Sequence, residues 1–203
     1  IGQHVLQGSR EAYTTPLWKT FGTLVHEATH CTRCGKSYAS HVYKNIHTIV
    51  LPETGTHGIE DLFIDQLGRE PLGTTRVPDI CQRDPENPQL GGCGAQNKRY
   101  KHTTIVTSPP VLALTLLRFT WSDRLRRPVK LHTKVNFNAG FPPIQGAGQY
   151  DLRAALQHRG DHPTSTNSGH YTAYVRASDA DWYHCDDAKP PRRCENGIAD
   201  VLP

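Results

Sequence analysis

The chain has 203 residues and a formal net charge of +4, and 36% of its residues are hydrophobic while 21% are charged. This balance predicts a folded globular domain and excludes a largely disordered chain. The sequence contains no run of eighteen apolar residues and no charged-then-apolar leader, so it predicts a soluble protein without a membrane span or a signal peptide.

The start of the sequence is unusual, because it opens on Ile1 and the chain contains no methionine. Ordinary removal of an initiator methionine does not expose a side chain as large as isoleucine. We therefore expect a fragment whose natural start lies elsewhere.

The first half of the chain combines strands with one helix. Residues 21–30 and 46–51 are rich in strand-forming residues and predict strands on either side of a cysteine turn. Between residues 56 and 70, apolar residues recur at helical spacing, and acidic residues occupy the first turn, where they oppose the helix dipole. This segment predicts a short amphipathic helix.

Four cysteines in this half indicate a metal site. Cys31 and Cys34 belong to a Cys-x-x-Cys-Gly turn, which aims two thiolates at one point and is poor geometry for a disulfide between separate elements. A tetrahedral zinc site would take Cys81 and Cys93 as its second pair, although eleven residues separate them where a regular turn would hold two. We predict one structural zinc ion at these four cysteines. The alternative is a metal-free cluster of buried thiols.

The second half is expected to consist mainly of strands. Residues 111–117 form a continuous apolar run, which is typical of a core strand buried on both faces. Residues 129–137 and 150–158 alternate between apolar and polar side chains and predict two half-buried strands. On the second of these, the side chains expected to face the core are Tyr150, Leu152, Ala154, Leu156 and His158.

A small cluster of cations comes just before residue 131. It consists of Arg124, Arg126, Arg127 and Lys130. Such a cluster is typical of a solvated hairpin loop, and the alternatives are a site for an acidic partner or a nuclear-targeting signal. The basic residues are otherwise scattered, which argues against a nucleic-acid-binding surface.

The residues best suited to catalysis lie near the C-terminal end. His170 follows Gly169 at the start of a strand-forming run, and a second such run ends at Asp186 and Asp187. Antiparallel pairing of the two runs would place Asp186 within hydrogen-bond reach of His170, while the alternation of the pleat would turn Asp187 away. A histidine oriented by an acid is the general-base half of a nucleophile, histidine and acid triad.

Taken in order, these motifs closely resemble those of the ubiquitin-specific proteases over nearly the whole chain. The motifs are Phe21-Gly22, Cys31-x-x-Cys34-Gly35, the helix, the second cysteine pair, Leu116-Leu117-Arg118-Phe119, Tyr150-Asp151-Leu152-Arg153-Ala154, His158-Arg159-Gly160, Gly169-His170-Tyr171 and Trp182-Tyr183-His184-Cys185-Asp186-Asp187. The resemblance implies an α+β fold of mostly antiparallel strands. In it, a zinc-ribbon-like fingers arm spans about residues 20–107, and a papain-like cysteine-protease palm spans about residues 108–203.

The resemblance also implies roles for individual residues. His170 takes the place of the general base, Asp186 that of the orienting acid, and Asp187 that of a secondary polar group near the site. Gly169 and Tyr171 are expected to bind substrate. The aromatic residues expected to serve as core are Phe119, Trp182 and Tyr183.

The chain departs from the family pattern at the nucleophile. The family's catalytic cysteine lies in an Asn/Gly-rich box that opens the thumb, well before the first cysteine turn, but no cysteine precedes Cys31 here. Cys185 should point away from the face that carries Asp186, and Cys194 lies in a loop without a companion motif, so neither is expected to replace it. The thumb and its nucleophile are therefore expected to be missing.

Two classes of function stay open. The chain would be part of a cysteine-type deubiquitinase, inactive alone, that cleaves the isopeptide bond after the C-terminal glycine of ubiquitin. The alternative is a non-catalytic ubiquitin-binding pseudo-protease or a zinc-ribbon interaction module. We expect ubiquitin or ubiquitinated proteins as partners, neither nucleic acid nor membrane, a monomer, and a cytoplasmic or nuclear location.

Overall fold

The computed structural model describes residues 14–82, 91–137, 141, 149–159, 169–178 and 181–197. Strands dominate these residues and most pair in antiparallel fashion, so the predicted α+β class is confirmed. The chain divides into two compact units. The first comprises Ile1–Ile49, Phe63–Thr115 and Pro143–Gly148, and the second comprises Val50–Leu62, Leu116–Pro142 and Gln149–Pro203.

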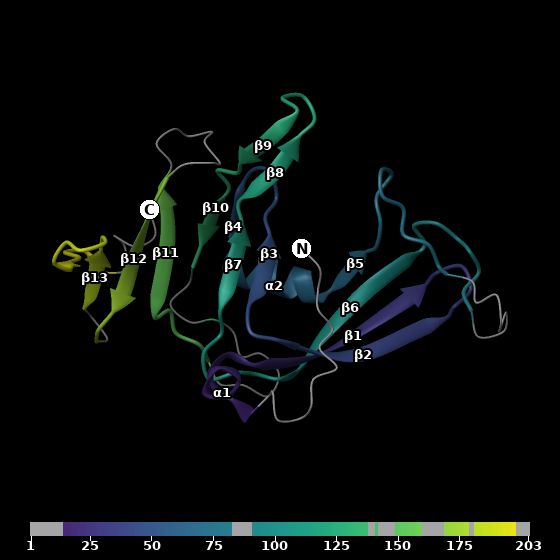
Figure 1. Cartoon of the computed structure of the whole chain (residues 1–203), viewed down its shortest axis with the longest axis horizontal. Coiled ribbons are helices and arrows are strands. Elements are labelled where there is room, and N and C mark those ends of the chain that lie inside the picture. The colour runs from purple at the N-terminus through teal and green to yellow at the C-terminus, as the bar shows by residue number, and fades with distance from the viewer. Residues whose placement is uncertain are drawn as a thin grey trace. The chain divides into compact units, whose positions relative to one another are not determined.

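The first unit contains a four-stranded antiparallel sheet in the order β2-β1-β6-β5 (Figure 1). Its strands are β1 (Thr23–Cys31), β2 (Ser37–Lys44), β5 (Arg69–Pro71) and β6 (Arg99–Thr107). Strand β1 confirms the strand predicted at residues 21–30, and its Val25 is fully buried opposite Ile105 of β6. The sequence did not predict β2, because nearly all of its side chains are exposed and it lacks an apolar alternation.

Two helices occur among the described residues, α1 (Pro16–Phe21) and α2 (Ile59–Leu67). The second confirms the predicted amphipathic helix, with Glu60 and Asp61 in its first turn. Its buried apolar residues Ile59, Leu62 and Phe63 lie on one side, as the helical spacing requires. Neither helix is long and apolar enough to cross a membrane.

The second unit contains the sheet that carries the candidate catalytic residues. Its strands, in the order β11-β12-β13-β14, are β11 (Ala154–Arg159), β12 (His170–Arg176), β13 (Trp182–Cys185) and β14 (Arg192–Arg193). All neighbours in this sheet are antiparallel (Figure 1). Tyr174 and Trp182 form its buried core, against which Leu152, Ala155 and Cys194 pack.

Within the described residues, the other strands form three small two-stranded sheets. Strand β3 (His47–Val50) pairs with β7 (Leu114–Leu117), β4 (Thr56–Gly58) pairs in parallel with β10 (Lys134–Asn136), and β8 (Phe119–Ser122) forms a hairpin with β9 (Arg127–Lys130). A strand forms at the predicted residues 46–51, but it is not the strand that leaves the cysteine turn. Strand β2 takes that place beside β1, whereas β3 pairs with β7.

Two strand predictions in the second half were wrong in detail. The apolar run at residues 111–117 is not a core strand, since Val111 and Leu117 are each more than 40% exposed and β7 has a single neighbour among the described strands. Residues 129–137 are not one strand either. Leu131 and Thr133 are buried in the predicted alternation, but the Thr133 hydroxyl donates to the Pro52 carbonyl, and the chain leaves the pleat there.

The predicted register of residues 150–158 was also wrong. Ala155 packs on the Tyr174 and Trp182 core, while Leu156 is 80% exposed and Ala154 is exposed. Both Arg153 and Ala154 face solvent, so the alternation shifts by one residue before β11 begins. Two adjacent alanines carry too little apolar area for the sequence pattern to decide which of them is buried.

Candidate functional site

The two residues that the sequence pairs across the hairpin do meet in the structure. His170 Nε2 lies 2.5 Å from Asp186 Oδ1. Strands β12 and β13 pair from Ala173 opposite Cys185 to Arg176 opposite Trp182, so His170 begins one strand and Asp186 directly follows the other. The pleat places both on the face that also carries Tyr174 and His184.

The Asp186 carboxylate is held from both sides. One carboxylate oxygen accepts the hydrogen bond from His170, and the other lies 2.7 Å from Lys189 Nζ. The Lys189 backbone N–H also donates to the Asp186 carbonyl at 3.1 Å. Hydrogen bonds from Lys189 and then from His170 lower the pKa of Asp186 to about 2. The carboxylate is therefore ionised at neutral pH and accepts both hydrogen bonds.

This arrangement decides which atom of the imidazole can act as a base. Since an ionised carboxylate can only accept, the proton shared with Asp186 belongs to Nε2 of His170. In the neutral ring, Nδ1 then carries the free lone pair. An acid that fixes the tautomer and steadies the protonated ring is what a general base for a thiol requires.

Asp187 does not face away from the histidine, so that prediction was wrong. Its Oδ2 lies 3.7 Å from His170 Nδ1. The alternation of the pleat ends with β13 at Cys185, and Asp187 has a positive φ of 48°, which turns its side chain back toward the imidazole. Asp187 therefore lies next to the free nitrogen of the ring.

The backbone before the histidine approaches its neighbours closely. A Cβ atom placed on Gly169 would lie 2.7 Å from the Arg159 carbonyl oxygen and closer still to His158 Nε2. The His158 ring also packs on Tyr171, with ring centroids 4.7 Å apart. Only glycine allows this contact between β11 and the start of β12. Gly160, which belongs to the same motif as His158, is outside the described residues.

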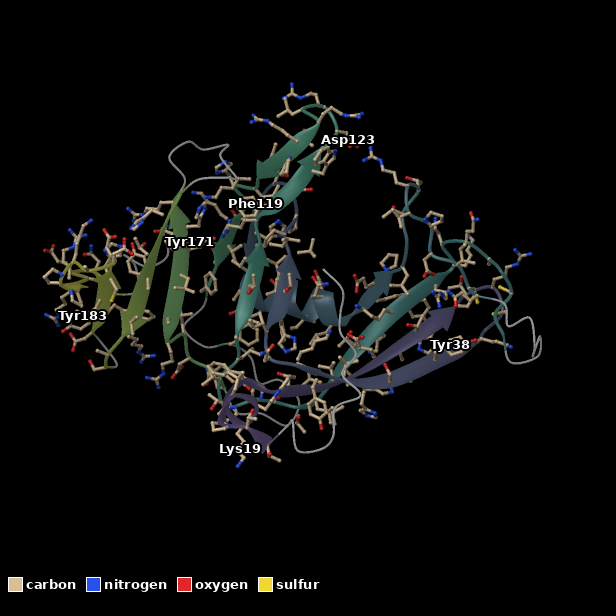
Figure 2. The ribbon with its side chains drawn as sticks, viewed as in Figure 1. Lys19, Tyr38, Phe119, Asp123, Tyr171 and Tyr183 are labelled. Atoms are coloured by element: carbon tan, nitrogen blue, oxygen red, sulfur yellow. The ribbon has the colours of Figure 1, made fainter. Side chains whose placement is uncertain are left out.

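The expected aromatic core is present only in part. Trp182 is 3% exposed and lies in the core of the sheet, whereas Phe119 is 37% exposed and is not a core residue. Tyr171, expected at the substrate, directly follows His170 in β12 and is 65% exposed. Figure 2 labels this side chain.

The four predicted metal ligands come together at the end of the first unit's sheet. The Sγ atoms of Cys31, Cys34, Cys81 and Cys93 all lie within 4.8 Å of one another. Those of Cys31 and Cys93 are 3.8 Å apart, and those of Cys34 and Cys81 are 3.9 Å apart. In a tetrahedral site with zinc–sulfur bonds of about 2.3 Å, the sulfur atoms are about 3.8 Å apart. The spacing fits zinc and is far too long for disulfides.

The second cysteine pair, Cys81 and Cys93, forms the same turn as the first pair, although more residues separate its two cysteines. In the first turn, the Gly35 N–H donates to the Cys31 carbonyl at 2.9 Å, and in the second the Gly94 N–H donates to the Cys81 carbonyl at 2.8 Å. A hydrogen bond of 2.5 Å from the Gly92 N–H to the Gln82 carbonyl closes the insertion. Cys81, Gln82, Gly92, Cys93 and Gly94 thus repeat the Cys-x-x-Cys-Gly geometry.

The thiols of the cluster differ in their surroundings. Backbone N–H groups of Cys34 and Arg33 lower the pKa of Cys31 to about 6 against the opposing effect of burial. Burial raises the pKa of Cys81 to about 11. A zinc ion would supply the positive charge that holds all four sulfurs as thiolates.

The remaining two cysteines are not partners of the histidine among the described residues. Among the described residues, the side-chain partners of His170 are the carboxylates of Asp186 and Asp187. Cys194 packs against the Tyr174 and Trp182 core, and Cys185 pairs with Ala173 inside the sheet.

Sequence reasoning missed Lys189 as a partner of the acid. The signal was present, because a lysine three residues after an aspartate in a turn is within reach of its carboxylate. It gave no reason, however, to choose Lys189 over the nearby Arg192 and Arg193. Arg193 in fact pairs with Asp181.

Known proteins resemble this chain in sequence and in fold. A protein-family model described as ubiquitin carboxyl-terminal hydrolase matches residues 4–196. The chain is 33% identical over 187 residues to ubiquitin carboxyl-terminal hydrolase 23 of Arabidopsis thaliana, covering 88% of this chain and 20% of that protein. It is 27% identical over 158 residues to ubiquitin carboxyl-terminal hydrolase 22 of Bos taurus, covering 64% of this chain and 29% of that protein.

Two solved structures have a fold similar to that of this chain. The SAGA Ubp8/Sgf11/Sus1/Sgf73 DUB module bound to ubiquitin aldehyde matches with a TM-score of 0.70 at 17% identity, over 97% of this chain and 42% of that one. The yeast SAGA DUB module with an Sgf73 mutant matches with a TM-score of 0.69 at 18% identity, over 92% and 39% of the two chains. The chain thus spans less than half the length of the proteins it matches, and it belongs to the ubiquitin carboxyl-terminal hydrolase family.

Proposed function

We propose that this chain supplies the general base and the orienting acid of a cysteine-type deubiquitinase. The observation that carries the proposal is the 2.5 Å contact between His170 Nε2 and Asp186 Oδ1, which leaves Nδ1 as the basic atom. Its matched relatives are named ubiquitin carboxyl-terminal hydrolases, and two of the solved proteins with this fold are described as bound to monoubiquitin and to ubiquitin aldehyde. The proposed reaction is hydrolysis of the isopeptide bond after the C-terminal glycine of ubiquitin.

The proposed mechanism assigns each residue a task. His170 Nδ1 takes the proton of a thiol as its sulfur attacks the carbonyl carbon, and the charged ring then returns this proton to the departing amine, which leaves a thioester. Water that gives a proton to the same nitrogen then attacks the thioester carbon, and the departing sulfur regains that proton as the carboxylate product is released. Asp186 stabilises the charged ring between these steps, and Lys189 holds Asp186 in place. Gly169 lets the backbone of β12 start close to β11, and Tyr171 offers an exposed ring to the substrate.

The thiol itself is proposed to come from outside this chain. Four of the six cysteines form the metal cluster, and the other two lie in the sheet and its core. We therefore expect the isolated chain to bind ubiquitin without hydrolysing its conjugates. The lack of a thiol next to His170 in the described residues also favours the second candidate, a ubiquitin-binding protein of this fold without activity.

The metal cluster is proposed to bind one structural zinc ion at Cys31, Cys34, Cys81 and Cys93. In this proposal, the ion caps an arm over about residues 20–107, and about residues 108–203 form the palm. The remaining expectations stand as parts of the same proposal: ubiquitin or ubiquitinated proteins as partners, a monomer, and a cytoplasmic or nuclear location.

The test combines a reactive ubiquitin probe with a binding measurement. Incubation with ubiquitin carrying an electrophilic C-terminus should give no covalent adduct, whereas calorimetry with unmodified ubiquitin should show saturable binding. A covalent adduct that persists in the His170→Ala variant would show a reactive thiol unrelated to the proposed base. Absence of any binding would contradict the proposed function itself.

A further inference from the structure

Histidines gather on one face of the first unit's sheet, on the three neighbouring strands β2, β1 and β6 (Figure 1). They are His26 and His30 of β1, His41 of β2 and His102 of β6. The strand register places His41 directly opposite His26, on the face away from the buried Val25. His102 shares this face and is the diagonal neighbour of His26, because it pairs with the residue two positions along β1.

The backbone pairing of β1 and β2 brings the side chains of His26 and His41 together. At the end of these strands the Cys31 N–H donates to the Lys36 carbonyl at 2.9 Å, which makes those two residues a hydrogen-bonded pair. Hydrogen-bonded and non-hydrogen-bonded pairs alternate, so His26 and His41, an odd number of residues away, form a non-hydrogen-bonded pair. Side chains lie closer in such pairs, and the two ring centroids are 5.2 Å apart.

The imidazole nitrogens of three of these histidines have no protein partner. Within the described residues, no hydrogen bond or ion pair involves His26, His41 or His102. His30 differs, because its Nδ1 lies 2.6 Å from Ser37 Oγ. Three imidazoles on one face are therefore free to bind a ligand through nitrogen.

A set of imidazoles without a carboxylate favours zinc over calcium or magnesium, which take oxygen ligands. Glu27, next to His26 in the sequence, points to the other face of the sheet and pairs with Lys44. Zinc–nitrogen bonds are about 2.1 Å long, so two imidazoles on one tetrahedral ion have ring centroids about 5 Å apart. The separation of the His26 and His41 rings fits this arrangement.

We propose that His26 and His41 bind a zinc ion on this face of the sheet, with His102 as the third ligand. Diagonal neighbours on adjacent strands are about 7 Å apart, within reach of an imidazole, and a change of rotamer would direct the His102 ring to the ion. Water would complete the tetrahedron. The site is separate from the four cysteines, and it does not depend on the proposed hydrolase activity.

Zinc at this position would fasten the edge of the sheet. Among the described strands β2 pairs with β1 alone, and most of its side chains are exposed. An ion that joins β2, β1 and β6 binds the folded sheet, whereas the unfolded chain does not hold the three imidazoles together. Added zinc should therefore raise the unfolding temperature.

The test is a calorimetric titration with zinc chloride, carried out on the chain after its cysteine cluster has been loaded and free zinc removed. We expect one further zinc ion per chain, bound more weakly than the first, and a higher unfolding temperature at saturation. The single substitutions His26→Gln and His41→Gln should each weaken the binding of this ion by about tenfold or more, and His102→Gln by about threefold or more.

Two matched controls remove one imidazole elsewhere. His57 Nε2 lies 3.0 Å from the Thr54 carbonyl oxygen, and His170 belongs to the other described group of histidine and carboxylates that could hold a metal. The His57→Gln and His170→Gln variants should bind the further zinc ion within about twofold of the parent chain.

Four results would overturn the site. These are the absence of a further zinc ion, unchanged binding in any of the three face variants, an equal loss in His57→Gln, or a loss in His170→Gln, which would place the ion at the catalytic residues. Thermal unfolding without added zinc confirms that each variant folds. The difference between parent and variants isolates this site whatever the cysteine cluster holds.

Discussion

Among single residues, Asp186 is the one on which the geometry of the site depends, because two side chains contact its carboxylate. One Asp186 carboxylate oxygen accepts a hydrogen bond from His170, and the other accepts one from Lys189. These two contacts fix the plane of the carboxylate and keep it ionised. Gly169 contributes differently, since its missing side chain lets β12 begin against His158. Three of these residues could be selected from the sequence motifs, but Lys189 required the structure, because its reach depends on the turn that follows β13.

Replacing Lys189 with alanine should raise the pKa of Asp186. The direction follows because Lys189 is the leading cause that lowers this pKa to about 2, and its removal destabilises the ionised form. Carbon-13 titration of the carboxylate measures the change, and Lys189→Arg should largely restore the original value. An unchanged titration in Lys189→Ala would mean that the contact is not maintained in solution.

Replacing Gly169 with alanine should displace the start of β12. The added methyl group would meet a backbone carbonyl, which cannot move without breaking the pairing of β11 and β12. We expect a loss of stability of about 1–3 kcal/mol, read from denaturant unfolding. Ala173→Gly makes the reverse exchange in the middle of the same strand and serves as the control. A Gly169→Ala variant with unchanged stability would contradict the close contact.

Burial of His47 makes stability depend on pH. Burial, followed by repulsion from Lys44, lowers the pKa of His47 from 6.5 to about 4. Between these values the unfolded chain binds more protons than the folded chain, so stability is full above pH 6.5 and falls as the pH drops toward 4, by up to about 3 kcal/mol. The His47→Leu variant should show a flatter dependence over this range, and a parallel dependence would assign the effect to other groups.

At the scale of elements, strong local patterns were predictive and weak ones were not. Helix α2 combines apolar spacing with acidic residues in its first turn, and both signals agree. Strand β2 is exposed along nearly its whole length, so its partner β1 rather than its own sequence makes it a strand. The predicted register before β11 was wrong because the adjacent Ala154 and Ala155 are equally apolar, so the pattern does not indicate which of them is buried. The apolar run at residues 111–117 does not indicate how many strands lie next to β7.

Removal of metal should unfold the end of the first unit's sheet. Chelation, or a Cys81→Ser substitution, leaves buried thiols without the ion that joins the two cysteine turns, and we expect a loss on the order of several kcal/mol. Elemental analysis should find one zinc ion per chain. Cys194→Ser controls for loss of a thiol outside the cluster, and full stability of metal-free protein would favour the metal-free alternative.

At the scale of the whole molecule, the sequence predicted which residues meet better than it predicted burial. The order of motifs brought His170 to Asp186 and four distant cysteines to one point, because each motif is tied to a turn or strand end of fixed geometry. Burial of Phe119 and Leu156 was misjudged, since it depends on which faces of neighbouring strands are covered, and no local pattern contains that information.

The central claim is that Asp186 fixes His170 as a base with a free Nδ1. The most direct measurement is a long-range nitrogen-15 correlation spectrum of the imidazole in the zinc-loaded chain. The neutral ring should carry its proton on Nε2, and this hydrogen-bonded proton should give a low-field resonance. The proton resonance should disappear in the Asp186→Ala variant and stay unchanged in the Asp151→Ala control. A ring protonated on Nδ1, or a mixture of tautomers insensitive to Asp186, would contradict the account.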